Sequence, residues 1–238
     1  MPKGTTKRRP QTLARLLDAG LRVFADAGFE GARIEDVCRL AGYTRGAFYS
    51  NFSSKDELFF ALFEAHAARE LGRIAGLAEE LTEGPGGGQV EGPGARSAEG
   101  PGGGSGGGHG SGALTLDAVA GLLARVEPDE RTWFLITTEF TLYAIRNPAA
   151  ASALADHDAR LRERAAPLLR GLLARAGLRL RPGVAADEVV RAVIALREGS
   201  LGQAYVEPGR TAPGELAERF LPALLASVTC PVTCDDAC

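Results

Sequence analysis

The stretch from Ile34 to Phe52 limits the fold more than any other part of this chain. Apolar residues recur at helical spacing on both sides of Gly42, a residue type that adopts positive φ without strain. They are Ile34, Val37, Cys38 and Ala41 before the glycine, and Phe48 and Phe52 after it. The pattern predicts two short helices joined by a tight turn, with the Thr44 hydroxyl capping the second helix. This arrangement is a helix-turn-helix.

The exposed side of the second predicted helix carries small and hydrogen-bonding side chains. They are Thr44, Arg45, Ala47, Tyr49 and Asn51. Such a face suits base edges and phosphates. The charge distribution agrees, because residues 1–58 hold ten Lys and Arg against seven Asp and Glu, whereas the remainder holds 17 against 23. The positive end of the chain is therefore the helix-turn-helix end.

Two further helices are predicted around this motif. Leucines and Phe24 repeat at helical spacing over residues 10–27, and Gly28 is expected to end that helix. The sequence after the motif predicts a capping box. In it the Ser54 hydroxyl accepts a hydrogen bond from the Glu57 amide, and the Glu57 carboxylate accepts one from the Ser54 amide. The helix that starts there runs to about residue 81 and would be about 40 Å long. It can connect a three-helix head to the rest of the protein.

The run from Gly42 to Leu58, GYTRGAFYSNFSSKDEL, resembles the DNA-binding signature of the TetR family of transcriptional regulators. The resemblance covers about the first quarter of the chain. Two positions depart from the family pattern. Relatives commonly carry a capping Thr or Ser where this chain has Ala32-Arg33, and they often carry His where it has Asn51.

The resemblance implies an all-α fold, with an N-terminal three-helix helix-turn-helix head and a larger helical ligand-binding and dimerisation domain. It also implies a homodimeric repressor that binds a palindromic operator in double-stranded DNA and is released by a small, lipophilic effector. Carried over position by position, it assigns Thr44, Arg45 and Ala47 to base edges. It assigns Tyr49, Asn51 and Lys55 to phosphates.

Composition divides the chain into six segments. They are a basic arm (1–9), the helix-turn-helix domain (10–54), the connecting helix (55–83), a Gly-rich insertion (84–112), a helical domain (113–229) and a Cys-containing tail (230–238). The arm either follows DNA or is a solvated terminus. The insertion holds fifteen Gly and three Pro in 29 residues, so we expect it to be disordered.

Periodicity predicts helices at about 114–126, 128–146, 149–176, 184–205 and 213–228. The last two carry apolar stripes. These contain Val184, Val189, Val193, Leu196 and Ser200, then Leu216, Phe220, Leu224 and Val228. By resemblance these helices would form a four-helix bundle with a second subunit; alternatively, they complete the core of one chain.

The helix at 128–146 combines aromatic residues with threonines, as a cavity for a small lipophilic effector requires. The predicted cavity residues are Trp133, Thr137, Phe140, Thr141 and Tyr143. The competing interpretation is that these residues are ordinary core.

The tail offers an alternative switch, since Cys230, Cys234 and Cys238 are spaced at i, i+4 and i+8. Three thiolates could serve a metal- or thiol-sensing regulator, although the spacing matches no common zinc pattern. A helical lipid-binding protein without DNA function is a further alternative. We expect no catalytic residues, cofactor or metal site, because none of the three histidines has a nucleophile or ligand partner at a recurring spacing. We expect a cytoplasmic protein without a membrane span.

Overall fold

A computed structural model describes residues 8–83 and 114–232, with the side chains of residues 8 and 9 left out. The predicted Gly-rich insertion, most of the basic arm, and Cys234 and Cys238 lie outside the described residues. Within them the elements are helices and one pair of short strands. Their bounds are α1 Arg8–Gly31, α2 Ile34–Ala41, α3 Arg45–Tyr49, α4 Lys55–Glu83, α5 Leu116–Ala124, α6 Glu130–Arg146, α7 Pro148–Arg175, β1 Leu178–Leu180, α8 Ala186–Val206, α9 Glu215–Val228 and β2 Thr229–Pro231. The predicted all-α class with an N-terminal helix-turn-helix and a larger C-terminal domain is confirmed.

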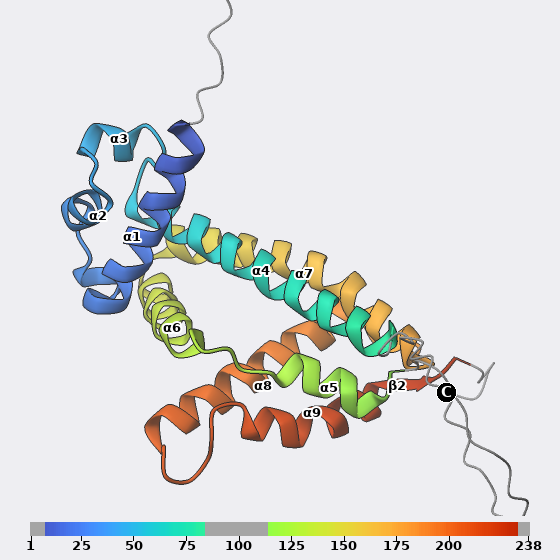
Figure 1. The fold of residues 1–238 in the computed structure, drawn as a ribbon. Coiled ribbons are helices and arrows are strands. Elements are labelled where there is room, and N and C mark those ends of the chain that lie inside the picture. The colour runs from blue at the N-terminus through green and yellow to red at the C-terminus, as the bar shows by residue number, and fades with distance from the viewer. Residues whose placement is uncertain (1–7, 84–113, 233–238) are drawn as a thin grey trace, which may run out of the picture.

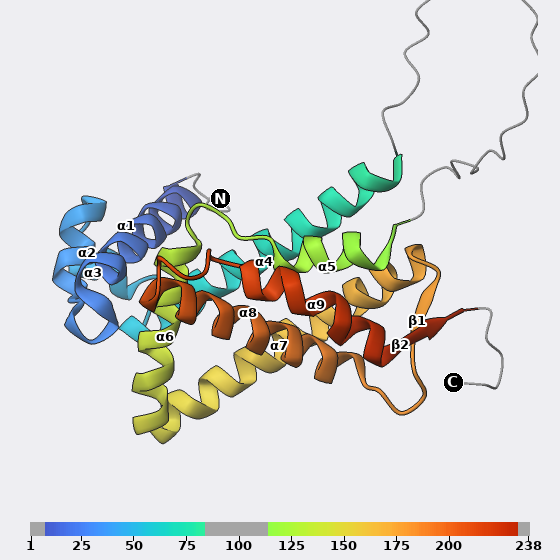
Figure 2. The same ribbon diagram turned by 90° about the horizontal axis from the view of Figure 1, so that it is seen from below.

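Helices α1 to α3 form a head at one end of the molecule (Figure 1). Helix α4 leads away from the head beside α7, while α5, α8 and α9 pack together on the other side of the body (Figures 1 and 2). Helix α6 contacts both α1 and α7, so it joins the head to the body.

An aromatic cluster holds this junction together. Phe140 of α6 stacks face to face on Phe59 of α4, with ring centroids 3.7 Å apart. The Phe29 ring meets Phe140 edge-on at 4.7 Å and lies 5.0 Å from the ring of Tyr143. Because Phe29, Phe59 and Phe140 are all fully buried, the core of the head continues into α6.

Local chemistry in the head follows the predictions from sequence. Gly28 has φ 70° and interrupts the helical backbone, and Gly42 has φ 73° at the end of α2. The Thr44 hydroxyl accepts a hydrogen bond of 3.3 Å from the amide of Ala47 and caps α3. At the start of α2, Arg33 makes no side-chain cap, as its sequence indicated.

The capping box before α4 is only partly as predicted. The Ser54 hydroxyl accepts from the Glu57 amide at 3.0 Å. The Glu57 carboxylate, however, accepts from the backbone amide and the hydroxyl of Ser53, both at 2.6 Å. It therefore reaches back one residue further than a capping box requires.

The prediction that the chain is helical to residue 228 misses one feature, the antiparallel pair of β1 and β2. Arg179 lies opposite Cys230 in this pair, which places Cys230 in a buried strand. The stripe predicted on α8 is also turned inward, because Val189, Val193 and Ser200 are buried within one chain. On α9, by contrast, Phe220 is 49% exposed. Within the described ranges, no helix has both the length and the apolar character to cross a bilayer.

Candidate DNA-reading head and ligand cavity

Helix α3 presents a short polar face at the surface of the head. Thr44, Arg45 and Tyr49 are exposed, while Phe48 on the opposite side is fully buried and anchors the helix. Ala47 is half-buried. The geometry agrees with the predicted exposed side at Thr44, Arg45 and Tyr49, whereas Ala47 and Asn51 are half-buried. The assignment of these residues to base edges or phosphates stays a prediction.

Arg45 is held by its neighbours across the surface. Its guanidinium lies 2.9 Å from the Glu35 carboxylate of α2, and a second nitrogen donates to the Tyr49 hydroxyl at 3.5 Å. The Tyr49 hydrogen bond is the main cause that raises the pKa of Arg45, followed by the charge of Glu35. An exposed pair of this kind contributes little to stability, so Arg45 can leave Glu35 for another acceptor at low cost.

Asn51 and Lys55 make contacts within the chain that the sequence did not predict. The Asn51 amide donates to the Ala47 carbonyl at 2.8 Å. The Lys55 ammonium donates to the carbonyls of Phe29, Glu30 and Ala32, at 2.6, 3.2 and 3.2 Å. Burial lowers the pKa of Lys55. This side chain therefore ties the start of α4 to the end of α1.

On the body side of the head, Glu139 of α6 completes the end of α1. Its carboxylate accepts a hydrogen bond of 2.7 Å from the amide of Phe29. Gly28 makes room for this contact, because a Cβ at that position would lie 2.3 Å from a Glu139 oxygen. Sequence alone gave no signal for Glu139, since its partner is 110 residues away.

A cavity of about 450 Å³ lies in the body between α4, α6, α7 and α8. Its apolar walls include aromatic rings from two helices: Phe59, Phe63, Trp133 and Phe134. Its volume lies within the range of small-molecule sites, which is about 300–1,000 Å³. Of the five predicted cavity residues, Trp133, Thr137 and Thr141 line this space. Phe140 and Tyr143 belong to the aromatic cluster around Phe29 and are not among the lining side chains.

Charged groups also line the cavity. Glu130 is 9% exposed, and its Oε1 lies 3.0 Å from Arg197. Its Oε2 is buried and has no hydrogen-bond partner among the described residues. The half-buried Asp158 of α7 and the exposed Glu198 of α8 line the same space, and partial desolvation raises the pKa of both carboxyls. None of these carboxylates was predicted, because an acidic residue at a helix start or on a helix surface is unremarkable in sequence.

His66 and Trp133 form one wall of the cavity. Their rings stack with centroids 4.0 Å apart. Arg69 donates to His66 Nδ1 at 2.9 Å, so the proton of the neutral ring sits on Nε2. Burial is the largest cause that lowers the pKa of His66 to about 4. The imidazole is therefore neutral at pH 7.

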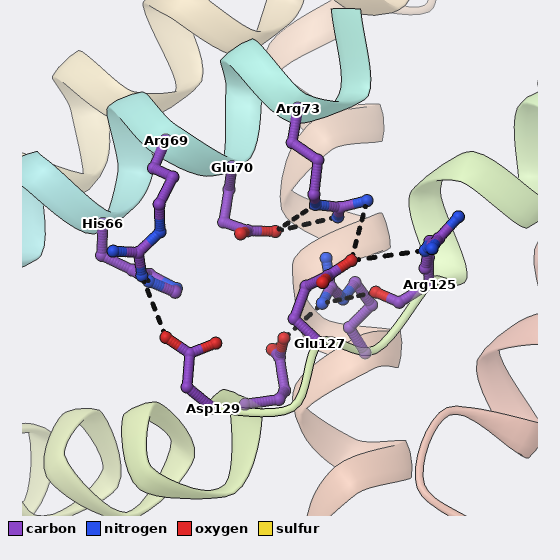
Figure 3. A network of polar contacts seen from close by, with 9 residues as sticks. His66, Arg69, Glu70, Arg73, Arg125, Glu127 and Asp129 are labelled. Carbon is purple, nitrogen blue, oxygen red and sulfur yellow. Dashed lines mark hydrogen bonds and ion pairs between the residues drawn. The ribbon is translucent and has the colours of Figure 1, made fainter. Parts of the chain in front are cut away.

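A polar network connects this wall to the loop between α5 and α6 (Figure 3). Asp129 accepts from Arg69 at 3.1 Å and from the Trp133 indole at 3.3 Å. Arg73 pairs with Glu70 at 2.9 Å and with Glu127 at 3.2 Å. Helix α4 is thus bound to the start of α6 beside the cavity.

The cysteines give no metal cluster in the described part of the chain. Cys230 is 3% exposed in β2, and the other two cysteines of the tail lie outside the described residues. Across residues 8–83 and 114–232, no group of three or more His, Cys, Asp or Glu side chains is placed to hold a metal ion.

Comparison with known proteins assigns the head. Residues 16–62 match the N-terminal domain of the family described as bacterial regulatory proteins, tetR family. This match places residues 16–62 in the TetR family. A curated relative, the uncharacterized HTH-type transcriptional regulator YwcC of Bacillus subtilis, is 39% identical over 57 residues of this chain. The alignment covers 24% of the chain and only 26% of YwcC.

Solved structures extend the similarity in fold to the body. A TetR transcription regulator from Haloarcula marismortui aligns with a TM-score of 0.58 at 14% identity, covering 93% of this chain and all of that one. The multidrug binding protein EbrR, complexed with imidazole, aligns with a TM-score of 0.55 at 21% identity. That alignment covers 98% of this chain and 100% of EbrR. At these identities the similarity concerns the fold.

Proposed function

We propose that this protein is a ligand-responsive, DNA-binding transcriptional repressor. The observation that carries the proposal is the exposed face of α3, presented by a TetR-family helix-turn-helix whose turn and cap are both formed. Thr44, Arg45 and Ala47 contact base edges, with Arg45 bidentate to a guanine after it leaves Glu35. Tyr49 and Asn51 contact phosphates, and Lys55 adds positive charge near the backbone while it caps α1.

The repressor acts as a homodimer on a palindromic operator. A second copy packs against the outer faces of α8 and α9. There the small residues Ala195 and Gly199 allow close approach, and the exposed Phe220 offers an apolar contact. Two heads then enter successive major grooves on one side of the duplex, at centres about 34–36 Å apart.

A small effector occupies the cavity and releases the operator. The cavity volume and aromatic walls support this role, and the multidrug-binding relative EbrR offers a precedent on the same fold. Trp133, Thr137 and Thr141 are the predicted effector contacts that line the cavity.

Release follows from the two connections between cavity and head. Helix α4 lines the cavity at His66 and Phe63 and is bound to α1 at its Lys55 end. Helix α6 lines it at Trp133 and is bound to α1 through Glu139. An effector that prefers a different spacing of these two helices also prefers a different position of the heads. Only this difference in affinity can shift the operator equilibrium.

The test is a selection of bound duplexes from a random-sequence pool, using the full chain at low salt. We expect enrichment of an inverted repeat whose half-sites are about 10–10.5 base pairs apart, or a multiple of that spacing. Two chains should bind per duplex, with affinity that falls as salt rises. A pool that shows no enrichment, or a single half-site bound by one chain, would overturn the proposal.

A further inference from the structure

One residue that lines the cavity, Glu130, has a buried polar atom that the described protein does not satisfy, its Oε2. Four buried side-chain atoms lack a hydrogen-bond partner within the described residues: Arg73 Nη1, Glu127 Oε1, Glu130 Oε2 and His157 Nδ1. The first two lie 3.2 Å apart and form an ion pair with each other. Only Glu130 among these residues lines the cavity. The Glu130 side chain is 12% exposed, and its Oε2 atom is buried. Buried acceptors of this kind are normally paired.

The chemistry of this atom requires a donor from the occupant. An ionised carboxylate only accepts hydrogen bonds. The nearest cation is already shared, because Arg197 lies 3.0 Å from Glu130 Oε1 and also donates to the Arg125 carbonyl at 3.2 Å. A ligand with an N–H group would supply the missing hydrogen bond to the carboxylate, and a positively charged N–H group would make that hydrogen bond strongest.

Two more carboxylates line the same space. Asp158 and Glu198 form no ion pair within the described part of the chain, and the charge of Asp158 adds to burial in raising the pKa of Glu198. The guanidinium groups of Arg162, Arg191 and Arg197 line the cavity too. Arg191 is exposed, Arg197 is paired with Glu130, and Arg162 is half-buried, so the buried unsatisfied atom among the charged lining residues is the acidic Glu130 Oε2.

The remainder of the cavity selects for an apolar body. Phe59, Phe63 and Trp133 present rings, and leucines from α4 and α7 contribute further apolar surface. Aromatic faces also attract a cation electrostatically. We infer that the effector is an amphiphilic amine, whose protonated nitrogen donates to Glu130 Oε2 and whose apolar part lies between α4 and α6. This inference rests on the proposed effector function and specifies its chemical class.

Four probes with the same ten-carbon tail separate the possibilities: decylamine, decyltrimethylammonium, decanol and decanoate. Trp133 is the only tryptophan of the chain, so its fluorescence reports occupancy of the cavity without DNA. We expect decylamine to bind most tightly, because it alone combines a positive charge with N–H donors. Tighter binding of decanoate would assign the cavity to anions through its arginines and overturn the inference, as would equal binding of decanol. If decyltrimethylammonium binds as tightly as decylamine, the N–H donor contributes nothing to affinity, and this result would also contradict the inference.

The variant Glu130→Gln tests the named atom. It should reduce decylamine affinity by about tenfold or more, as the loss of a charged hydrogen bond does, and leave decanol affinity unchanged. Glu127→Gln is the matched control, since Glu127 lies in the loop just before α6 and pairs with Arg73 without lining the cavity. Unchanged decylamine affinity in Glu130→Gln would refute the inference. The probe series on the unmodified protein decides the question independently if the variant does not fold.

The outcome also separates this inference from the proposed function. If decylamine binds but does not release the protein from its selected operator, release by an effector of this class is refuted. The amine-binding site itself would still stand. Operator release by decanol or decanoate, without decylamine binding, would keep the repressor mechanism and refute the amine.

Discussion

Glu139 and Phe29, which are 110 residues apart, are joined by a hydrogen bond of 2.7 Å between a carboxylate of α6 and a backbone amide at the end of α1. The contact exists because Gly28 adopts φ 70° and ψ 170°, a conformation almost confined to glycine. One hydrogen bond thus links α6, which lines the cavity, to the helix-turn-helix head.

A double-mutant cycle measures this link. Glu139→Ala should lower the free energy of unfolding by about 1–3 kcal/mol, because the buried Phe29 amide loses its acceptor. Gly28→Ala adds backbone strain and a clash with Glu139, so it should cost less in the Glu139→Ala background than in the native chain. Urea unfolding of the native chain, the two single variants and the double variant gives the coupling free energy between Gly28 and Glu139. Additive effects would show that the two residues do not interact, and Glu163→Ala on the exposed side of α7 serves as control.

Lys55 is expected to stabilise the head before any DNA is present. Lys55→Met keeps the aliphatic stem but removes the donor to three carbonyls, so the free energy of unfolding should fall by about 1–3 kcal/mol. Thermal unfolding of the free protein is the measurement. If Lys55→Met is as stable as the native chain and still weakens binding to every duplex, the ammonium acts on phosphates alone.

The neutral His66 makes stability depend on pH. Its pKa is about 4 in the folded chain and near 6.5 when unfolded, so below pH 6.5 the unfolded state binds the proton first. Stability is therefore complete above pH 6.5 and declines as the pH falls toward 4. Burial lowers the pKa of His157 as well, which adds to the decline.

Urea unfolding at pH 7 and pH 5 should show a smaller loss for His66→Gln than for the native chain. The same loss in both proteins would mean that His66 is as well solvated when folded as when unfolded.

Phe220 tests the dimer surface. Phe220→Asp places a charge on the proposed α8–α9 contact, and we expect the dimer to dissociate and operator affinity to fall. Ile145→Asp is the control, because Ile145 is equally apolar, is 74% exposed and lies on α6. Sedimentation equilibrium of the three proteins is the measurement. A dimeric Phe220→Asp, or an Ile145→Asp that dissociates, would place the contact elsewhere.

Sequence predicted those parts of the head whose cause is local. The Gly42 turn and the Thr44 cap depend on residues within five positions of one another, so spacing alone identified them. Helix bounds in the body were predicted to within a few residues for the same reason. The β1–β2 pair was missed because each strand has three residues and the partners, such as Arg179 and Cys230, are distant in sequence.

The cavity shows the limit of periodicity more clearly. Thr141 and Tyr143 are both on α6, but at 100° per residue they point about 160° apart. Thr141 lines the cavity, whereas Tyr143 packs toward Phe29. Which side of a buried helix borders a cavity depends on the neighbouring helices, and periodicity carries no information about them.

The measurement that tests the central claim most directly is the sequence preference of Arg45→Ala. Affinities are compared for the selected operator and for a scrambled duplex of the same composition, with Arg39→Ala of α2 as control. Loss of a bidentate guanine contact should reduce the preference by about 1–3 kcal/mol in Arg45→Ala and leave it intact in Arg39→Ala. An Arg45→Ala protein that keeps the full preference of the native chain would contradict the claim that α3 reads the operator.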